Sequence, residues 1–204
     1  MKRRNLLLGA LGAATLAPSG ALAALSPTPR QSRGPFYPDR LPLDRDNDLV
    51  RVEGREGIAR GEITHLTGRV LDRSGKPLPG ALVEIWQCDA NGRYIHSSDP
   101  GSTPRDLGFQ GYGRFETGDD GGYRFRTIKP VPYPGRAPHI HVAVRFPGHP
   151  PLVTQIYVKG AAENAGDWLL ANADDPGALI VPFRPIEASD ATLAAEFDLV
   201  LPVG

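Results

Sequence analysis

Short runs in which apolar and polar residues alternate recur along the chain from residue 62 onward. Successive side chains of a β-strand point to opposite faces, so a period of two predicts strands rather than helices. The clearest run places Leu82, Glu84 and Trp86 on one face and Val83 and Ile85 on the other. The pattern as a whole predicts strands over Thr64–Leu71, Ala81–Gln87, Tyr123–Ile128, His139–Phe146, Thr154–Val158 and Glu196–Leu201.

The segments between these runs are rich in residues that favour turns. Asp72–Pro77, Asp89–Gly92 and Asp119–Gly122 combine Asp and Gly, which supply local hydrogen bonds and left-handed backbone conformations. We expect irregular loops over 98–114 and 130–138, and a single helical turn over Asp167–Ala171. Many short strands separated by turns predict an all-β fold, with an antiparallel β-sandwich core and long loops.

The part of the chain before residue 62 does not share this periodicity. Prolines are frequent between residues 24 and 48, which predicts an extended lead-in rather than helices or paired strands. We therefore divide the chain into an irregular N-terminal arm over 24–61 and a β-sandwich domain over 62–204.

The first 23 residues have the layout of an export signal. A basic start with an Arg pair, Lys2–Arg4, precedes the apolar run Leu6–Leu16 and the small-residue cleavage motif Ala21–Ala23. This layout predicts a signal peptide over 1–23, of the twin-arginine type, and a mature protein that is periplasmic or secreted. The alternative is a short membrane anchor, but so short an apolar run does not span a bilayer as a helix, so no membrane partner is expected after signal removal.

Composition narrows the classes of function. The 204 residues carry 23 Lys and Arg and 23 Asp and Glu, and no basic run stands out beyond the N-terminus, which argues against a nucleic-acid partner. The single cysteine, Cys88, excludes a disulfide framework within the chain and any Cys-x-x-Cys metal site, and its strand position favours a small buried residue.

The candidate chemistry begins with His139 and His141. Side chains two apart on a strand share a face, so both imidazoles are expected to point the same way and could hold one metal ion. A zinc site would require nearby Cys or carboxylate ligands, and the candidates close in sequence are instead Tyr94 and Tyr133. A phenolate needs a strongly charged cation to stay ionised near neutral pH, which favours Fe(III). The alternatives are structural histidines and core tyrosines.

Several segments in the same order resemble the intradiol ring-cleavage dioxygenases, of the protocatechuate 3,4-dioxygenase type. The resemblance runs from about residue 28 to the end of the chain. It includes the order Tyr, Tyr, Arg-x-x-His-x-His that a ligand set of this family requires. The segments that carry it are Gly34–Pro38, Ile85–Gln87, Gly92–Tyr94, Tyr123–Pro130, Pro132–Pro134, Arg136–His141 and Thr154–Tyr157.

The resemblance implies a non-haem Fe(III) held by Tyr94, Tyr133, His139 and His141, with a solvent hydroxide as a fifth ligand. It implies that a catechol binds through both oxygens, that Tyr133 and the hydroxide take its protons, and that O2 attacks the ring. Both oxygen atoms would enter between the hydroxylated carbons, giving a cis,cis-muconate-type diacid. Members of the family are often dimers or larger, so a homo-oligomer is compatible with this interpretation.

The resemblance also implies further site residues. Arg136 matches the catalytic Arg of the family, where a fixed guanidinium stabilises charge on the activated ring. Gln155 matches a residue near the iron, and Trp86, Phe36 and Tyr37 match aromatic positions near the substrate. Each of them could instead be structural: a salt-bridging Arg, a strand amide or core aromatics.

One departure from the family pattern concerns Gly135. Protocatechuate enzymes often carry a longer stretch beginning with Trp after the second Tyr-Pro, whereas here only Gly135 separates Pro134 from Arg136. A glycine removes a pocket wall, which predicts a more open substrate cleft and leaves protocatechuate, catechol, hydroxyquinol and larger catechols as candidate substrates.

Two other classes of protein are compatible with parts of the sequence. Gly68–Asp72 and Gly75–Ala81 resemble the pre-albumin-like and carboxypeptidase-regulatory-like modules of exported proteins, which would make this chain a non-catalytic binding module. A metal-dependent hydrolase using the same His pair would need an acid/base carboxylate, and the available Asp119 and Asp120 lie in a predicted turn.

Overall fold

The computed structural model describes residues 24–188 and 190–203. The predicted signal peptide over 1–23 lies outside the described residues. No helix among the described residues is long and apolar enough to cross a membrane.

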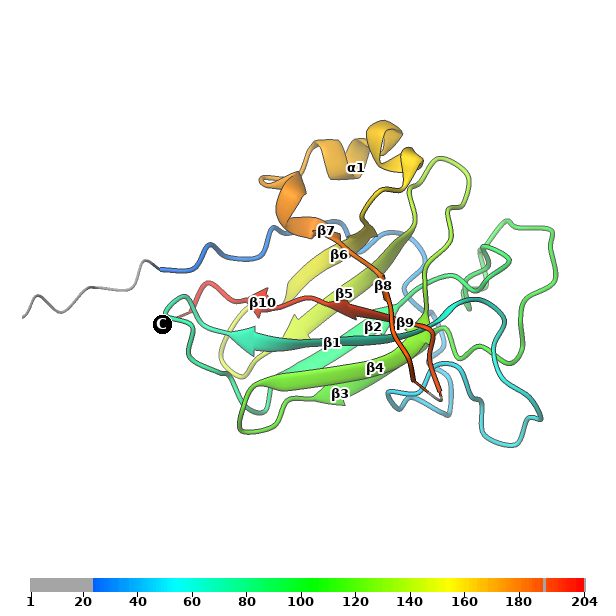
Figure 1. The fold of residues 1–204 in the computed structure, drawn as a ribbon, viewed down its shortest axis with the longest axis horizontal. Helices are drawn as coiled ribbons and strands as arrows, with labels where there is room; N and C mark the ends of the chain where they lie inside the picture. The colour runs from blue at the N-terminus through cyan, green and yellow to red at the C-terminus, as the bar shows by residue number, and fades with distance from the viewer. Residues whose placement is uncertain (1–23, 189, 204) are drawn as a thin grey trace, which may run out of the picture.

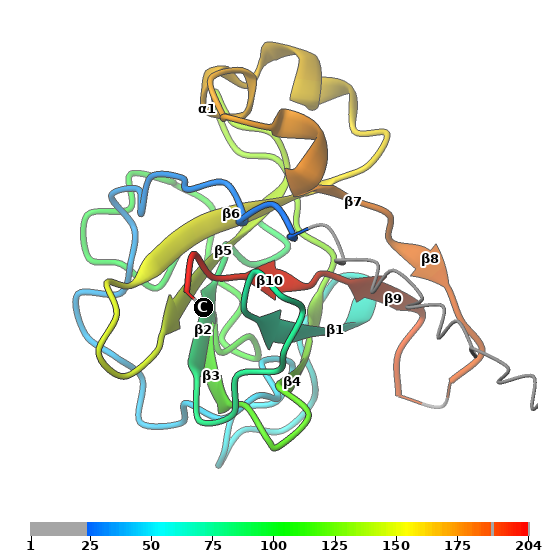
Figure 2. The same cartoon turned by 90° about the vertical axis from the view of Figure 1, so that its left-hand side faces the viewer.

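Two mixed β-sheets face each other (Figures 1 and 2). The first contains β1 (Ile63–Leu71), β4 (Gly122–Ile128), β8 (Arg184–Pro185), β9 (Leu193–Glu196) and β10 (Leu199–Val200). The second has the order β3 (Tyr112–Glu116), β2 (Leu82–Trp86), β5 (His139–Arg145), β6 (Leu152–Val158) and β7 (Ile180–Val181). The prediction of an all-β sandwich is confirmed. The central pairings are antiparallel as predicted, while β9 and β10 pair with β1 and β7 with β6 in parallel.

The core between the sheets is built from the inward faces of the strands. Leu66 and Phe125 of the first sheet and Ile85 and Ile140 of the second are almost completely buried in one cluster. Leu49 from the predicted arm belongs to the same cluster, so the arm contributes to the core although its sequence shows little periodicity. The arm also runs beside β6, because the Gln31 amide donates to the Val153 carbonyl at 2.8 Å.

The predicted helical turn is present as α1 (Trp168–Ala171), which begins at the N-cap residue Asp167. Two short 3-10 turns, Ala162–Gly166 and Pro176–Leu179, flank it, and the three together form the helical cap above β6 and β7 in Figure 1.

The strands differ from the sequence prediction in several places: β7, β8 and the part of β9 from Leu193 were not predicted. The segment 98–114 is not loop throughout, because Tyr112 begins β3 and pairs with Trp86 of β2. The predicted strand Glu196–Leu201 is interrupted, since the Asp198 carboxylate, rather than a backbone carbonyl, accepts from the Arg69 amide at 2.8 Å. Gly68 permits the close approach here, because a Cβ at that position would lie 2.0 Å from the Phe197 carbonyl oxygen.

Candidate metal centre

His139 and His141 open β5, which lies between β2 and β6 in its sheet. Both side chains point to the same face, as the spacing of two predicts, and both are 1% exposed. Their Nε2 atoms are 3.2 Å apart. The central strand β5 therefore directs the Nε2 atoms of both imidazoles toward the same point.

Tyr94 reaches this place from the loop that follows β2. The carboxylate of Asp89 accepts hydrogen bonds from the backbone amides of Asn91 and Arg93, which fixes the turn before it. The Tyr94 ring is almost fully buried, and its Oη lies 3.5 Å from Nε2 of His139. The phenol is thus held against the histidine pair by a rigid turn.

Tyr133 arrives from the loop between β4 and β5. Its ring is 5.6 Å from that of Tyr94 at 89° and 5.5 Å from that of His139. The Arg136 amide donates to the Tyr133 carbonyl at 2.9 Å, closing a tight turn in which Gly135 adopts a φ of +81°. Tyr133 is half-buried, so it forms the open side of the cluster, whereas Tyr94 forms the closed side.

Both histidines are neutral near pH 7, so each imidazole keeps a lone pair that could bind a metal ion. Burial, reinforced by the positive charge of Arg136, lowers the pKa of His139 to about 4. Burial and the neighbouring His139 lower the pKa of His141 well below its usual value. His139 Nδ1 lies 2.6 Å from the Ala137 carbonyl, which only accepts, so this nitrogen carries the proton and Nε2 presents its lone pair.

The donor set fits a hard, highly charged cation. Burial raises the pKa of Tyr94 well above its ordinary value, and burial also raises the pKa of Tyr133 against the opposing charge of Arg136. Only a strongly charged cation would make both phenols into phenolate ligands near neutral pH. Within 24–188 and 190–203, no group of three or more His, Cys, Asp or Glu could hold a metal, and the side chains that lie against the His pair are the phenols of Tyr94 and Tyr133.

Arg136 is fixed beside the cluster by three different acceptors. Its Nε donates to Oδ2 of Asp167 at 2.9 Å, and its Nη2 donates to Oε1 of Gln155 at 2.6 Å and to the Tyr157 hydroxyl at 3.1 Å. Its Nη1 lies 3.4 Å from the Tyr133 hydroxyl. The guanidinium is therefore held in one orientation, with Nη1 directed toward the Tyr133 hydroxyl.

Asp167 and Tyr157 are the members of this site that sequence reasoning missed. Tyr157 lies two residues after Gln155 on β6, and the period of two that paired the histidines would have placed it on the same face. Asp167 is buried and sits outside the sandwich strands, and its sequence signal is only that of a helix N-cap. Its approach to Arg136 is a tertiary contact.

The three aromatic residues predicted to contact substrate occupy different positions. Phe36 faces the cluster, with its ring 5.1 Å from that of Tyr94 in a stacked arrangement. Trp86 is completely buried behind His141, with the two rings parallel at 4.8 Å. Tyr37 packs edge-on against Trp86 at 5.0 Å. Phe36 is thus placed to line the site, while Trp86 and Tyr37 support a predicted ligand from behind.

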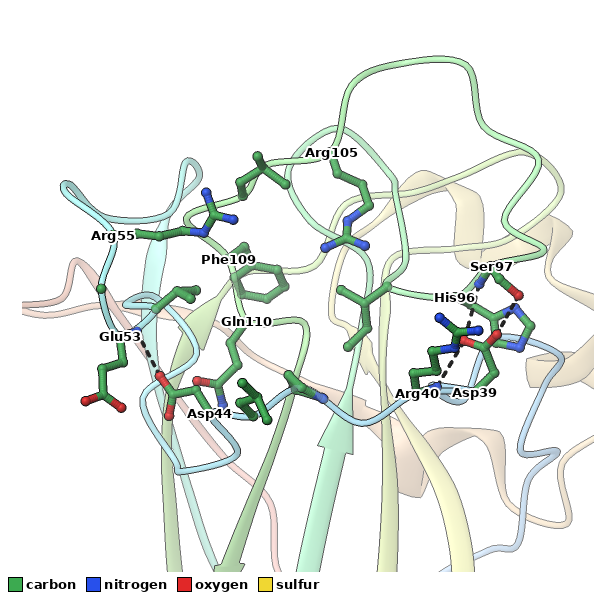
Figure 3. A pocket seen from close by; sticks show the side chains of 16 residues that line it. Asp39, Arg40, Asp44, Glu53, Arg55, His96, Ser97, Arg105, Phe109 and Gln110 are labelled. Atoms are coloured by element: carbon green, nitrogen blue, oxygen red, sulfur yellow. Dashed lines mark hydrogen bonds between the residues drawn. The ribbon is translucent and has the colours of Figure 1, made fainter.

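Open space lies next to Gly135 and, separately, beyond Phe36. A Cβ at Gly135 would meet no atom of the described residues within 4 Å, so none of them fills the place of a larger residue there. An open cavity of about 800 Å³ is lined by His96, whose ring is 6.0 Å from that of Phe36. Figure 3 shows Arg55 and Arg105 projecting into this cavity around Phe109. The predicted metal ligands do not line it.

Comparison with known proteins places this arrangement in a family. The sequence model of the family described as Dioxygenase matches residues 32–203, which begins inside the predicted arm. The protocatechuate 3,4-dioxygenase beta chain of Burkholderia cepacia is 38% identical over 176 residues, covering 76% of this chain and 74% of that protein. The chain belongs to the intradiol ring-cleavage dioxygenases. As a member of this family it is an oxidoreductase acting on catechols.

Further relatives include other intradiol dioxygenases. The catechol 1,2-dioxygenase of Candida albicans is 30% identical over 187 residues, covering 82% of this chain and 58% of that protein. The hydroxyquinol 1,2-dioxygenase of Nocardioides simplex is 33% identical over 146 residues, or 62% of this chain and 46% of that protein. The chain thus spans about half the length of these two curated relatives.

The fold agrees with solved structures of the family. The dioxygenase domain of a dioxygenase–carbohydrate-binding fusion from Streptomyces sp. SirexAA-E is 35% identical, with a TM-score of 0.68, and the match covers 88% of this chain and all of that one.

Proposed function

We propose that this intradiol dioxygenase holds a non-haem Fe(III) with Tyr94, Tyr133, His139 and His141. It would insert both atoms of O2 between the hydroxylated carbons of a catechol to give a cis,cis-muconate-type diacid. The observation that carries the proposal is the convergence of two neutral imidazoles and two phenols beside a fixed guanidinium. The bound iron would supply the Lewis acidity and electron transfer that make the catechol ring reactive toward O2.

Tyr133 is suited to accept a substrate proton. It is the less buried of the two phenols, and its Oη lies within reach of Arg136. Burial raises the pKa of its hydroxyl, so its phenolate oxygen is a strong enough base to take a proton from a catechol hydroxyl. Tyr94 is enclosed on all sides and is suited to remain in place.

Arg136 is suited to stabilise negative charge that develops on the bound catechol. Its orientation is set before substrate arrives, because Asp167, Gln155 and Tyr157 each accept one of its hydrogen bonds. A charge that is already oriented costs no reorganisation at the moment of reaction, which is why such groups act most strongly in buried sites.

The substrate class is a catechol that enters from the open side of the cluster. The absence of a side chain at Gly135 leaves room beside Tyr133, and Phe36 supplies an aromatic wall opposite. The names of the relatives include protocatechuate, catechol and hydroxyquinol as substrates. The layout of residues 1–23 supports an enzyme that is exported to the periplasm or secreted.

Product analysis tests the proposed reaction. The Fe(III)-loaded protein is mixed with catechol, protocatechuate and hydroxyquinol in air, and O2 uptake and products are followed. The proposal predicts one O2 consumed per ring opened and a muconate-type diacid from at least one of them. A semialdehyde product would contradict it, because that product comes from cleavage beside the hydroxylated carbons. Failure to open any catechol would favour the binding-module alternative.

A further inference from the structure

The two histidines of the metal centre are held in different ways. His139 donates from Nδ1 to the Ala137 carbonyl, the arrangement that usually orients a ligating imidazole. Nδ1 of His141 is fully buried and has no hydrogen-bond partner among the described residues. On its Nδ1 side, away from the Nε2 atom that lies 3.2 Å from Nε2 of His139, the His141 ring is therefore oriented by packing and not by a hydrogen bond.

Two neighbours supply that packing. The indole of Trp86 lies against one face of His141, with ring centroids 4.8 Å apart and planes within 4° of parallel. Trp86 stands directly opposite His141 in the pairing of β2 with β5. The backbone of Gly34 lies at the edge of the imidazole, since a Cβ there would be 3.1 Å from Cε1. The Gly34 contact depends on where the segment from Gly34 to Tyr37 is anchored, and Tyr37 of the same segment also packs against Trp86.

That anchor is the carboxylate of Glu84. It is 4% exposed, and its Oε1 accepts from the Tyr37 hydroxyl at 3.0 Å and from the Tyr112 hydroxyl at 2.6 Å. Its Oε2 accepts from Nε of Arg145 at 2.8 Å. A buried carboxylate with three donors is a strong and directional attachment point.

The ring of Tyr37 connects the Glu84 carboxylate to Trp86. It meets the indole edge-on at 5.0 Å, on the side of β2 that Glu84 and Trp86 share because they are two residues apart. The contacts thus run from Glu84 through the Tyr37 hydroxyl and ring to Trp86, and from Trp86 to His141. Glu84 itself does not touch the predicted metal ligands.

We propose that Glu84 is a positioning residue for the metal centre, acting through Tyr37 and Trp86 to fix the His141 imidazole. This inference rests on the proposed function in that His141 is taken as an iron ligand. The packing does for His141 what the Ala137 carbonyl does for His139. If the packing around His141 is loosened, all four predicted ligands remain, but iron should be bound less tightly.

The test removes one hydroxyl. Tyr37→Phe keeps the ring and loses only the hydrogen bond to Glu84. The control is Tyr123→Phe, since Tyr123 is a buried tyrosine whose hydroxyl donates to the Phe197 carbonyl, far from the metal centre, between β9 and β10 of the first sheet. Both variants lose one hydrogen bond of a tyrosine hydroxyl, and the bond lost in Tyr123→Phe is the more buried of the two. The control should therefore lose at least as much general stability, whereas only Tyr37→Phe disturbs the packing at His141.

The first readout is the rate at which a chelator removes iron from the Fe(III)-loaded proteins. The proposal predicts at least about tenfold faster removal from Tyr37→Phe, the lower end of the effect of changing groups that orient ligands. Tyr123→Phe should release iron at the rate of the unaltered protein. Equal rates for the unaltered protein and both variants would overturn the proposal, as would equal acceleration in both variants.

The second readout needs no metal. A stacked indole shifts the ring-proton resonances of His141 upfield, and Tyr37→Phe should move them toward ordinary values in the metal-free protein while those of His139 stay in place. Unchanged His141 resonances would overturn the proposal. If the unaltered protein took up no iron, the proposed function would fail, and this readout would still decide whether Glu84 positions His141.

A second variant acts on the carboxylate itself. Glu84→Gln keeps the shape and removes the charge, and it should also speed iron release. Because both changes weaken the same Tyr37–Glu84 contact, the combined variant should release iron no faster than about the more affected single variant. Additive effects of the two changes would show that Glu84 does not act through Tyr37 and would overturn the proposal.

Discussion

Asp167 accepts a hydrogen bond from Nε of Arg136 at 2.9 Å with one carboxylate oxygen, while the other caps the first turn of α1. The same Oδ2 also accepts from the Ala137 amide at 2.9 Å. The N-cap residue of α1 thus orients both the predicted catalytic Arg and the backbone leading into His139.

Asp167→Asn should lower turnover without removing the metal. The amide keeps an oxygen for one role but loses the charge and one acceptor, so Arg136 is free to turn from its working position. Misplacement by about 1 Å can cost up to about a hundredfold in rate. Steady-state turnover and iron content measure this. Asp190→Asn is the control, because Asp190 is an exposed aspartate bonded to His65, and full activity in both variants would contradict the assignment.

Arg136→Ala should retain iron and colour and lose turnover by about a hundredfold, the scale seen when one preorganised charge-stabilising group is removed. Arg136→Lys should rescue little of this, since a single ammonium cannot reproduce the planar fork that reaches Asp167, Gln155 and Tyr157 together. Turnover at saturating catechol, with iron quantified in each sample, distinguishes the two. An Arg136→Lys enzyme as active as the unaltered protein would show that geometry is not what Arg136 contributes.

His141→Ala should abolish iron binding and leave the sandwich folded. The imidazole supplies one of the converging nitrogens, but the strand pairing of β5 with β2 and β6 involves the backbone. Metal analysis and far-ultraviolet circular dichroism check the two parts of this prediction. His65→Ala is a suitable control, because His65 lies on β1 and pairs with the exposed Asp190. Stoichiometric iron in His141→Ala would remove His141 from the ligand set.

Cys88 should be inert in the folded protein over a wide range of pH. Burial raises the pKa of its thiol from 9.0 to about 12, so the reactive thiolate is scarce below that value and the group is also shielded. In the unfolded chain the thiol ionises near pH 9, so alkylation should be fast only after unfolding. Iodoacetamide labelling at pH 8 and pH 10, followed by mass, tests this. Rapid labelling of the folded protein at pH 10 would contradict the burial.

The sequence pattern located the His pair because its signal is local. Side chains two apart on a strand share a face, and the structure has His139 and His141 on one face. Tyr94 and Tyr133 were candidates from the sequence, but only resemblance to a family singled them out as ligands, since nothing in a loop sequence says which phenol turns inward. Asp167 was missed as a site residue because its contact with Arg136 joins the helical cap to the β4–β5 loop across the fold.

The errors in the fold have a similar origin. Strand β3 was not predicted because Gly113 lies inside it, and a glycine within a strand weakens the alternating pattern of apolar and polar residues. The structure requires this glycine, since a Cβ there would lie 2.5 Å from the Asp46 carbonyl oxygen of the arm. The interruption after Glu196 depends on the side chain of Asp198 taking the place of a backbone acceptor. Both are tertiary contacts, and a single sequence carries no periodic signal for them.

The central claim is a tyrosinate-ligated Fe(III) that binds a catechol, and a visible spectrum tests it most directly. The protein is loaded with Fe(III) and its absorption is recorded before and after a catechol is added without oxygen. We predict a red-brown charge-transfer band that is absent from the metal-free protein and moves when the catechol binds. A protein that stays colourless after Fe(III) is supplied would contradict the ligand assignment and with it the proposed function.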